Sequence, residues 1–198
     1  NVISLDQSCQ NAFCENNQVV YLPVKDAVSS VSGGFVGKLL DNIFLSFKFS
    51  LKIFRFVRNK DVVFSGTNPS ILVLFIAVLR PLIRFRWVLL VNDVFPENLV
   101  PARLLSSESF IFKIIRYLFD CAYRRADRII VIGRDMQKLV DKKTDNMGRT
   151  RYIPNWVDLD DISVVSKNTY QPFYQMSFED KVVFQFFGNM GVVQGLDI

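Results

Sequence analysis

The chain has 198 residues, half of them hydrophobic, and carries a formal charge of +5 from 24 lysines and arginines against 19 aspartates and glutamates. It contains no histidine, which excludes Ser-His and Cys-His catalysis and histidine-bound metals from this segment. The length suits one domain of ordinary size with some chain left over, and the positive charge favours phosphate-bearing ligands, anionic lipid or nucleic acid as partners.

The sequence shows neither a membrane-spanning segment nor a signal peptide. Its longest apolar run, 71–79, is well short of the roughly 20 residues that a transmembrane helix needs. The cysteines are odd in number and lack a metal-ligand spacing, so we expect free thiols in a reducing compartment: Cys9, Cys14 and Cys121. The chain begins at Asn1 and ends in what reads as the start of a helix, so we expect a segment of a longer protein.

Short β-branched runs alternate with helical patterns along the first 155 residues. Strands are expected over 18–24, 61–65, 87–91, 128–132 and 151–153. Helices are expected over 35–59, over 69–79 with Pro69 in a first helical position and Arg80-Pro81 as the stop, over 107–126 with Glu108 in the first turn, and over 135–142. This rhythm predicts an α/β fold, a Rossmann-like, doubly wound parallel sheet with helices on both faces.

The predicted helix 35–59 carries two apolar stripes. One is expected to face the core: Val36, Leu40, Ile43, Phe44, Phe47, Leu51 and Phe54. The other is expected to be exposed beside Lys48, Lys52 and Arg55, and contains Leu45, Phe49, Ile53 and Phe56. Cations among exposed aromatic residues are typical of a helix lying at an anionic membrane surface, and docking is expected to use Lys48, Lys52, Arg55, Phe49 and Phe56. The alternative is a helix buried on both sides with solvated lysines.

The rhythm of strands and helices breaks after Asn155. Residues 155–180 are rich in Asp, Ser and Asn and show no sustained apolar period, so 161–180 is interpreted as a linker. A fresh strand over 181–187 opens a second domain, 181–198, after a first domain over 1–160.

Polar residues and glycines follow each predicted strand. They are Gly66-Thr67-Asn68, Asn92-Asp93, Gly133-Arg134, Asn155 and Gly188-Asn189. The carboxyl ends of parallel strands meet at one edge of a sheet, where ligands bind, and such groups suit hydroxyl-rich and phosphorylated ligands. Asp93 either faces a substrate or caps the next turn, and the glycines at 188 and 191 either let backbone amides approach a diphosphate or make a tight turn.

Four stretches in order, NDVFPE (92–97), RRADRIIVIG (124–133), YIPNWVD (152–158) and FFGNMGVVQGLDI (186–198), resemble glycosyltransferases of family 4 with the GT-B fold. The resemblance is greatest to bacterial enzymes that extend lipid-linked O-antigen or capsule precursors. It implies that 1–160 is an acceptor-binding Rossmann-like domain lacking its first strand and helix. It also implies that 181–198 starts a nucleotide-sugar-binding domain whose glutamate pair lies further on.

The resemblance also implies roles for the strand-end residues. Asp93 is expected to contact the substrate and assist removal of a proton from the acceptor hydroxyl. Substrate binding at the same edge is expected from Thr67, Asn68, Asn92, Glu97 and Asn155, with a purely structural role as the alternative for Glu97 and Asn155. The loop that approaches the donor diphosphate is expected to contain Gly188, Asn189, Met190 and Gly191.

The implied reaction transfers a sugar, with an amino-deoxy sugar among the candidates, from a UDP-sugar to a polyprenyl-diphosphate-linked saccharide, with retention at the anomeric carbon. The UDP-sugar is a co-substrate, and neither a cofactor nor a metal is expected. The enzyme is expected in the cytoplasm, peripheral on the inner face of the cell membrane, without a nucleic-acid partner, and the segment alone is expected to be inactive. The sequence does not predict the donor sugar, the linkage or the oligomeric state.

Two other classes of protein compete with this interpretation. A different Rossmann enzyme normally shows Gly-x-Gly-x-x-Gly after its first strand, a motif not visible here. A non-catalytic basic module that binds lipid or nucleic acid would gather lysines beside exposed aromatics without a polar edge of strand ends.

Overall fold

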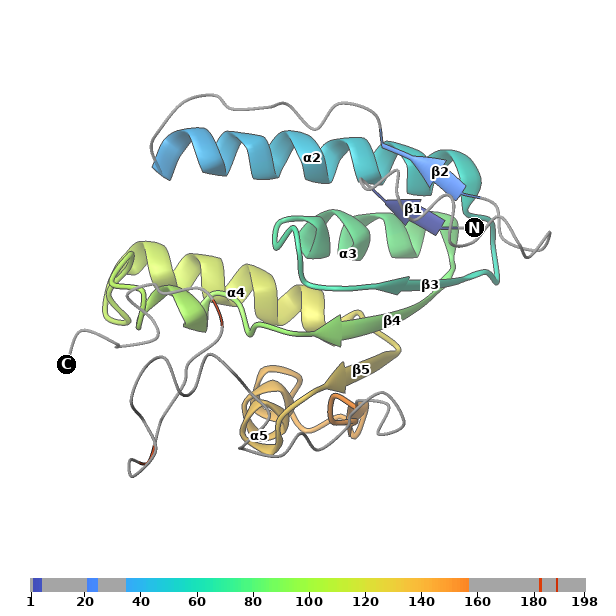
Figure 1. Ribbon diagram of the computed structural model, residues 1–198. Coiled ribbons are helices and arrows are strands. Elements are labelled where there is room, and N and C mark those ends of the chain that lie inside the picture. Colours follow the sequence, from blue (N-terminus) through green and yellow to red (C-terminus); the bar gives the residue numbers. More distant parts are fainter. Residues whose placement is uncertain (1, 5–20, 25–34, 157–181, 183–187, 189–198) are drawn as a thin grey trace. The chain divides into compact units, whose positions relative to one another are not determined.

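The computed structural model describes residues 2–4, 21–24, 35–156, 182 and 188. The chain divides into two compact units, Asn1–Pro154 and Asn155–Ile198, and the helices and strands described below belong to the first. In chain order they are β1 (Val2–Ser4), β2 (Tyr21–Pro23), α2 (Phe35–Phe56), β3 (Val62–Ser65), α3 (Leu72–Ile83), β4 (Arg86–Val91), the 3-10 helix η1 (Glu97–Leu99), α4 (Phe110–Arg124), β5 (Arg128–Val131), α5 (Arg134–Lys143) and β6 (Thr150–Tyr152) (Figure 1). The predicted linker 161–180 lies outside the described residues.

The strands form two parallel sheets. β1 pairs with β2, and the other four strands lie in the order β3-β4-β5-β6. A helix connects each strand of the larger sheet to the next, as the sequence rhythm predicts, so the α/β class with a Rossmann-like parallel sheet is confirmed. β1 was not predicted as a strand, because a three-residue strand is too short to show a period of two.

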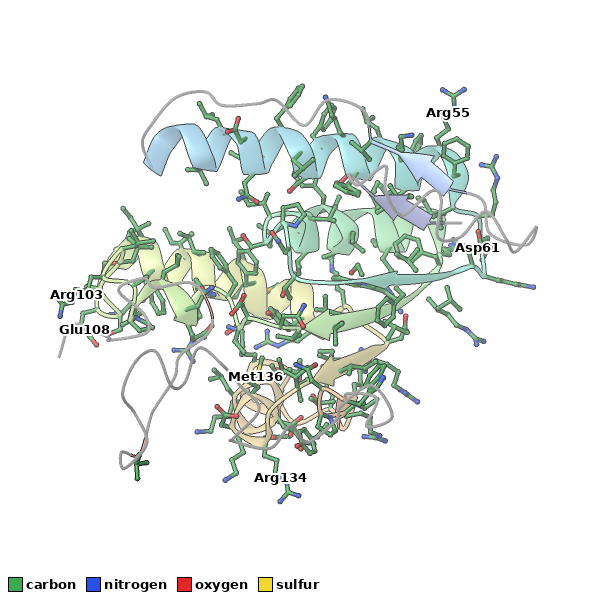
Figure 2. The ribbon with its side chains drawn as sticks, viewed as in Figure 1. Arg55, Asp61, Arg103, Glu108, Arg134 and Met136 are labelled. Atoms are coloured by element: carbon green, nitrogen blue, oxygen red, sulfur yellow. The ribbon has the colours of Figure 1, made fainter. Side chains whose placement is uncertain are left out.

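The core lies between the larger sheet and one layer of helices. Trp87, Leu89 and Val91 of β4 and Ile129 and Val131 of β5 are fully buried and cluster with residues of α3, α4 and α5. Successive side chains of a strand point to opposite faces, so these helices cover the same face of the sheet. The predicted cover of both faces by helices is therefore not seen for these strands in the described residues. On α5 the layer has a solvated outer side, from which Arg134 points away (Figure 2).

The central strand β4 is fixed to its neighbour by more than its backbone. The Trp87 indole N–H donates to the hydroxyl of Ser65 at 2.9 Å, while the ring itself is fully buried. A buried indole needs such a partner, because an unpaired N–H in the core is costly. The pairing aligns the register of β3 and β4, in which Ser65 lies opposite Leu89.

Three predicted helix ends are corrected. α3 begins at Leu72, after a cis Asn68–Pro69 peptide, and continues through Pro81 to Ile83, so Pro69 is not helical and Pro81 does not stop the helix. Pro81 falls in the last turns, where the chain ends soon after in a left-handed residue, Arg84. α4 begins after Ser109, whose hydroxyl accepts from the Phe112 amide at 3.1 Å, so Glu108 precedes the cap and is not in the first turn.

The prediction of which side of α2 faces the core is wrong. Ile53 is buried, and Phe49 is half-buried and packs against the core cluster. The stripe that was expected inside is exposed instead, including Phe44, Phe47 and Leu51. Both stripes are apolar, so periodicity finds the helix but not its orientation, and Phe49 drops out of the predicted membrane-docking set.

Within the described residues, no helix is both long and apolar enough to cross a bilayer.

An ion pair joins α3 to the amino-terminal ends of β4 and β5. Arg80 donates from Nε and Nη2 to the two carboxylate oxygens of Asp127, at 3.1 and 2.5 Å, and the Trp87 amide donates to Oδ2 at 2.7 Å. Burial alone raises the pKa of the Asp127 carboxyl, but these hydrogen bonds and the charges of Arg80 and Arg149 outweigh it and leave the pKa below its usual range.

We expect Asp127→Asn to lower the free energy of unfolding by about 1–3 kcal/mol at neutral pH, because a charged, bidentate acceptor is lost. A carboxyl whose folded pKa is depressed contributes stability above its unfolded pKa, about 3.9, and loses it as the pH falls through the folded value. Urea unfolding at neutral and acid pH measures the difference. Equal stability of the two proteins at pH 7 would contradict this role.

Candidate functional site

The carboxyl ends of β3, β4, β5 and β6 lie along one edge of the larger sheet, because all four strands are parallel. Thr67 follows β3 and is buried, with only 6% of its surface exposed. Its hydroxyl oxygen accepts from the backbone amides of Asn92 and Asp93, at 3.3 and 3.4 Å. Thr67 is predicted to bind substrate. In the structure its hydroxyl instead holds the start of the loop after β4.

Asp93 lies at the end of the central strand, as the sequence predicts, and its residue is exposed. Within the described part of the chain, no hydrogen bond or ion pair engages its carboxylate, and it caps neither η1 nor α4, whose N-caps are Pro96 and Ser109. Asp93 therefore has a fixed backbone and a carboxylate available to contact a ligand, as a substrate-binding or proton-accepting group needs. Asn92 and Asn68 are exposed at the same edge.

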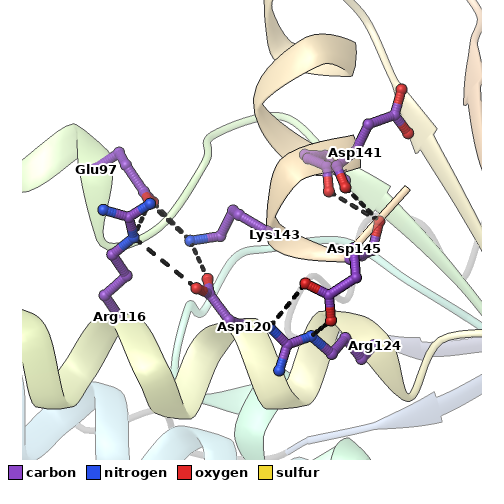
Figure 3. A network of polar contacts seen from close by, with 9 residues as sticks. Glu97, Arg116, Asp120, Arg124, Asp141, Lys143 and Asp145 are labelled. Atoms are coloured by element: carbon purple, nitrogen blue, oxygen red, sulfur yellow. Dashed lines mark hydrogen bonds and ion pairs between the residues drawn. The ribbon is translucent and has the colours of Figure 1, made fainter. Parts of the chain in front are cut away.

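Glu97 occupies a different environment, four residues after Asp93. Its two carboxylate oxygens accept from the ammonium group of Lys143 at 2.8 and 2.9 Å, and Arg116 lies 3.6 Å away (Figure 3). Both oxygens are therefore occupied by protein groups. The prediction that Glu97 binds substrate is not supported, and the alternative, that it holds the loop, agrees with the geometry.

Lys143 is the centre of this network. Its side chain is fully buried, and its ammonium group also lies 2.6 Å from the Asp120 carboxylate. Arg116 approaches Asp120 at 3.8 Å, so two cations and two carboxylates balance one another between η1, α4 and α5 (Figure 3). A buried ammonium group requires such partners, because desolvation of an unpaired charge is very costly.

Tyr123 lies beneath the network on α4. Lys143 sits 5.5 Å from the centre of its ring, and the hydroxyl is buried beside the backbone of Phe95, whose hydrogen bond favours the ionised form but does not outweigh burial. Burial, reinforced by the negative charges of Glu97, Asp120 and Asp93, raises the pKa of the Tyr123 hydroxyl well above its usual range. The hydroxyl therefore stays protonated and does not act as a base at neutral pH.

A cavity of about 750 Å³ opens beside β3. It is lined by Ser65, Gly66 and Asn68 at the carboxyl end of the strand, by apolar side chains of α2, and by Ile3 of β1. Cavities of this size accommodate small-molecule ligands. Asn68, a predicted substrate-binding residue, lies on its wall.

The remaining predicted residues belong to the second unit or lie outside the described chain. Asn155 is exposed and opens the second unit. Gly188 is exposed with φ of 154°, a conformation that side-chain-bearing residues rarely adopt, while Asn189, Met190 and Gly191 lie outside the described residues. In the described residues, no three acidic or cysteine side chains gather as a metal site.

Sequence reasoning missed the Lys143 network. Lys143 stands in the run Asp141-Lys142-Lys143, which reads as a solvated helix end. Its spacing was the available signal, since Met136, Val140 and Lys143 recur at i, i+4 and i+7 and so share one side of α5. Met136 packs against the core and Val140 is fully buried.

Comparison with known proteins identifies the family of this chain. The family model described as Glycosyltransferase Family 4 matches residues 17–161, which is more than half of the chain. The chain is 43% identical over 159 residues to a protein of Pseudomonas aeruginosa named "Probable glycosyltransferase WbjE". The match covers 80% of this chain and 40% of that relative, so the chain spans less than half of the relative's length. The chain belongs to glycosyltransferase family 4.

Proposed function

We propose that the complete protein transfers a sugar from a UDP-sugar to a hydroxyl of a lipid-linked saccharide, with retention at the anomeric carbon, in bacterial O-antigen or capsule synthesis. Family membership and the relative named as a probable glycosyltransferase support a transferase over the two competing classes. The match spans only 40% of that relative, so the activity is proposed for the whole protein and not for this segment alone.

The observation that carries the proposal is the position of the Asp93 carboxylate. This carboxylate has no partner among the residues that the structure describes, at the ligand-binding edge of a parallel sheet, while Thr67 fixes the Asp93 backbone. In the proposed reaction the acceptor hydroxyl gives up its proton, with help from Asp93, as its oxygen bonds to the anomeric carbon and the bond to UDP breaks. Asn68 and Asn92 supply exposed amide groups for sugar hydroxyls along the same edge.

We assign the donor diphosphate to the loop Gly188–Gly191, because backbone amides at a glycine-rich turn bind phosphate. No cofactor or metal is part of the proposal. The acceptor is a polyprenyl diphosphate, which resides in a membrane, and so the protein is proposed to work at the inner face of the cell membrane as a peripheral protein.

Release of UDP from the complete protein tests this function, measured for a panel of nucleotide sugars with and without a lipid-linked saccharide extract. We expect release that depends on one donor and on the lipid acceptor together. Release with a donor but no dependence on the lipid would overturn the acceptor class, and folded protein that releases UDP from none of the donors would overturn the UDP-sugar reaction.

A further inference from the structure

Three neighbouring helices expose apolar side chains on the side that faces away from the sheet. On α2 the exposed residues recur every three or four positions, including Leu40, Phe44, Phe47, Leu51 and Phe54, which are 47–59% exposed. Such a stripe normally marks the buried side of a helix. Here the buried side of α2 is the opposite one, where Ile53 joins the core.

The apolar surface continues from α2 onto α3. The two helices pack together, and the rings of Phe47 and Phe75 meet edge to face with centroids 6.4 Å apart. A shallow apolar groove between them is lined by Leu51 and Phe54 of α2 and by Val78 of α3. Val78 and Leu82 are 58% and 69% exposed, so α3 has apolar residues on its outer side as well as in the core.

α4 extends the same surface. Its buried residues, such as Phe119 and Tyr123, face the sheet, so its exposed residues lie on the outer side. The outer side is apolar, with Phe110, Ile111, Ile114, Tyr117 and Leu118 between 45% and 77% exposed. These exposed residues of α2, α3 and α4 together are called the apolar face below.

α5, the fourth helix of the same layer, provides the comparison. Its exposed residues are all charged: Arg134, Asp135, Lys138 and Lys142. A helix layer that meets only water is expected to look like α5, with polar residues on the outer side. A contiguous apolar face across three helices is the kind of feature that marks an interaction surface.

Basic residues lie along the α2 edge of the apolar face. At about 100° per residue, Lys48, Lys52 and Arg55 follow one edge of the exposed stripe on α2. Arg55 points away from the helix in Figure 2. The cations of α4 are already paired: Lys113 lies 3.7 Å from Glu108, and Arg116 contacts Glu97 and Asp120.

We propose that the apolar face docks on an anionic lipid bilayer. Phenylalanine and aliphatic side chains would enter the boundary between headgroups and acyl chains, while Lys48, Lys52 and Arg55 along α2 meet lipid phosphates. The formal charge of +5 acts in the same direction. This surface deepens the proposed function, because it would bring the sheet edge with Asp93 to a membrane-bound acceptor, but its test needs no sugar transfer.

Flotation of the protein with vesicles of phosphatidylglycerol and phosphatidylethanolamine tests the apolar part. We expect Phe54→Ser and Phe110→Ser each to weaken binding roughly tenfold, because each removes a large apolar side chain from the lipid. Phe64→Ser is the matched control: Phe64 on β3 is 62% exposed but lies outside the apolar face, and binding should not change.

A second pair of variants tests the basic edge at equal loss of charge. Lys52→Gln with Arg55→Gln should weaken binding about tenfold or more at low salt, while Lys138→Gln with Lys142→Gln on α5 should leave it near the native value. Equal losses for the two pairs would show attraction by net charge alone and overturn the surface. Equal binding to phosphatidylcholine vesicles would overturn the proposal that the surface recognises anionic lipid.

The Phe54→Ser variant also tests whether a second copy of the chain, and not a bilayer, covers the apolar face. Light scattering measures the mass of the native protein and of Phe54→Ser. A native dimer that Phe54→Ser dissociates, without vesicle binding by either, would overturn the proposal. Because flotation is measured without a nucleotide sugar, loss of vesicle binding and failure of the transfer reaction are distinct results.

Discussion

Lys143→Met should lower the free energy of unfolding by about 3–5 kcal/mol at neutral pH, because it leaves buried carboxylates without their closest cation. The ammonium group lies within 2.9 Å of both oxygens of Glu97 and 2.6 Å from Asp120. These carboxylate side chains are only 21% and 16% exposed, and Arg116 is too distant, at 3.6 and 3.8 Å, to replace the lost contacts. Methionine fills a similar volume, so the loss of stability would come from the missing charge and not from a cavity. Urea unfolding measures it.

The neighbouring lysine is the control. Lys142 is exposed in the same turn of α5, and Lys142→Met should change stability by less than about 0.5 kcal/mol. Adding Glu97→Gln and Asp120→Asn to Lys143→Met should restore part of the loss, since the repelling charges are then gone. A loss below about 1 kcal/mol for Lys143→Met would show that the network contributes little.

The strands were predictable because their signal is local. β4 contains the apolar run 87–91, closed by Asn92-Asp93, and an unbroken apolar run in the sequence is typical of a parallel strand between neighbours, although burial alternates along the strand in the structure. Its position and the polar residue at its end follow from the run itself. The helix at 107–126 was placed in the same way, and its start moved only because Ser109, and not an earlier serine, caps it.

The contacts between distant segments were not predictable. Glu97 and Lys143 are 46 positions apart, and nothing in the sequence alone brings α5 beside η1. Thr67 likewise reaches the amides of residues 25 and 26 positions later only because β3 and β4 are neighbours in the sheet. For α2 the local signal was ambiguous, since either apolar stripe satisfies a helical period, and only its packing on α3 selects Ile53 for the core.

Asp93→Asn in the complete enzyme should reduce turnover by about a hundredfold or more while donor affinity stays near the native value. A positioned base contributes about 10²–10⁴ in rate, and the amide keeps the shape of the side chain but cannot take the proton. The fold should be unaffected, because the Asp93 side chain makes no hydrogen bond in the described residues and its backbone is held by Thr67. Steady-state turnover and the dissociation constant for UDP-sugar separate the two quantities.

Asp135→Asn is the matched control, because it changes another exposed aspartate two residues after Gly133, at the end of the next strand. If charge near the sheet edge alone sets the rate, the two variants should lose similar amounts of turnover, whereas a base at Asp93 predicts loss for Asp93→Asn only. Thr67→Val extends the argument. It keeps the carboxylate but removes the oxygen that holds two backbone amides, so turnover should fall through displacement of Asp93 and stability should fall with it. Full activity of Asp93→Asn would refute the proposed catalytic role, leaving the free carboxylate without a part in the transfer.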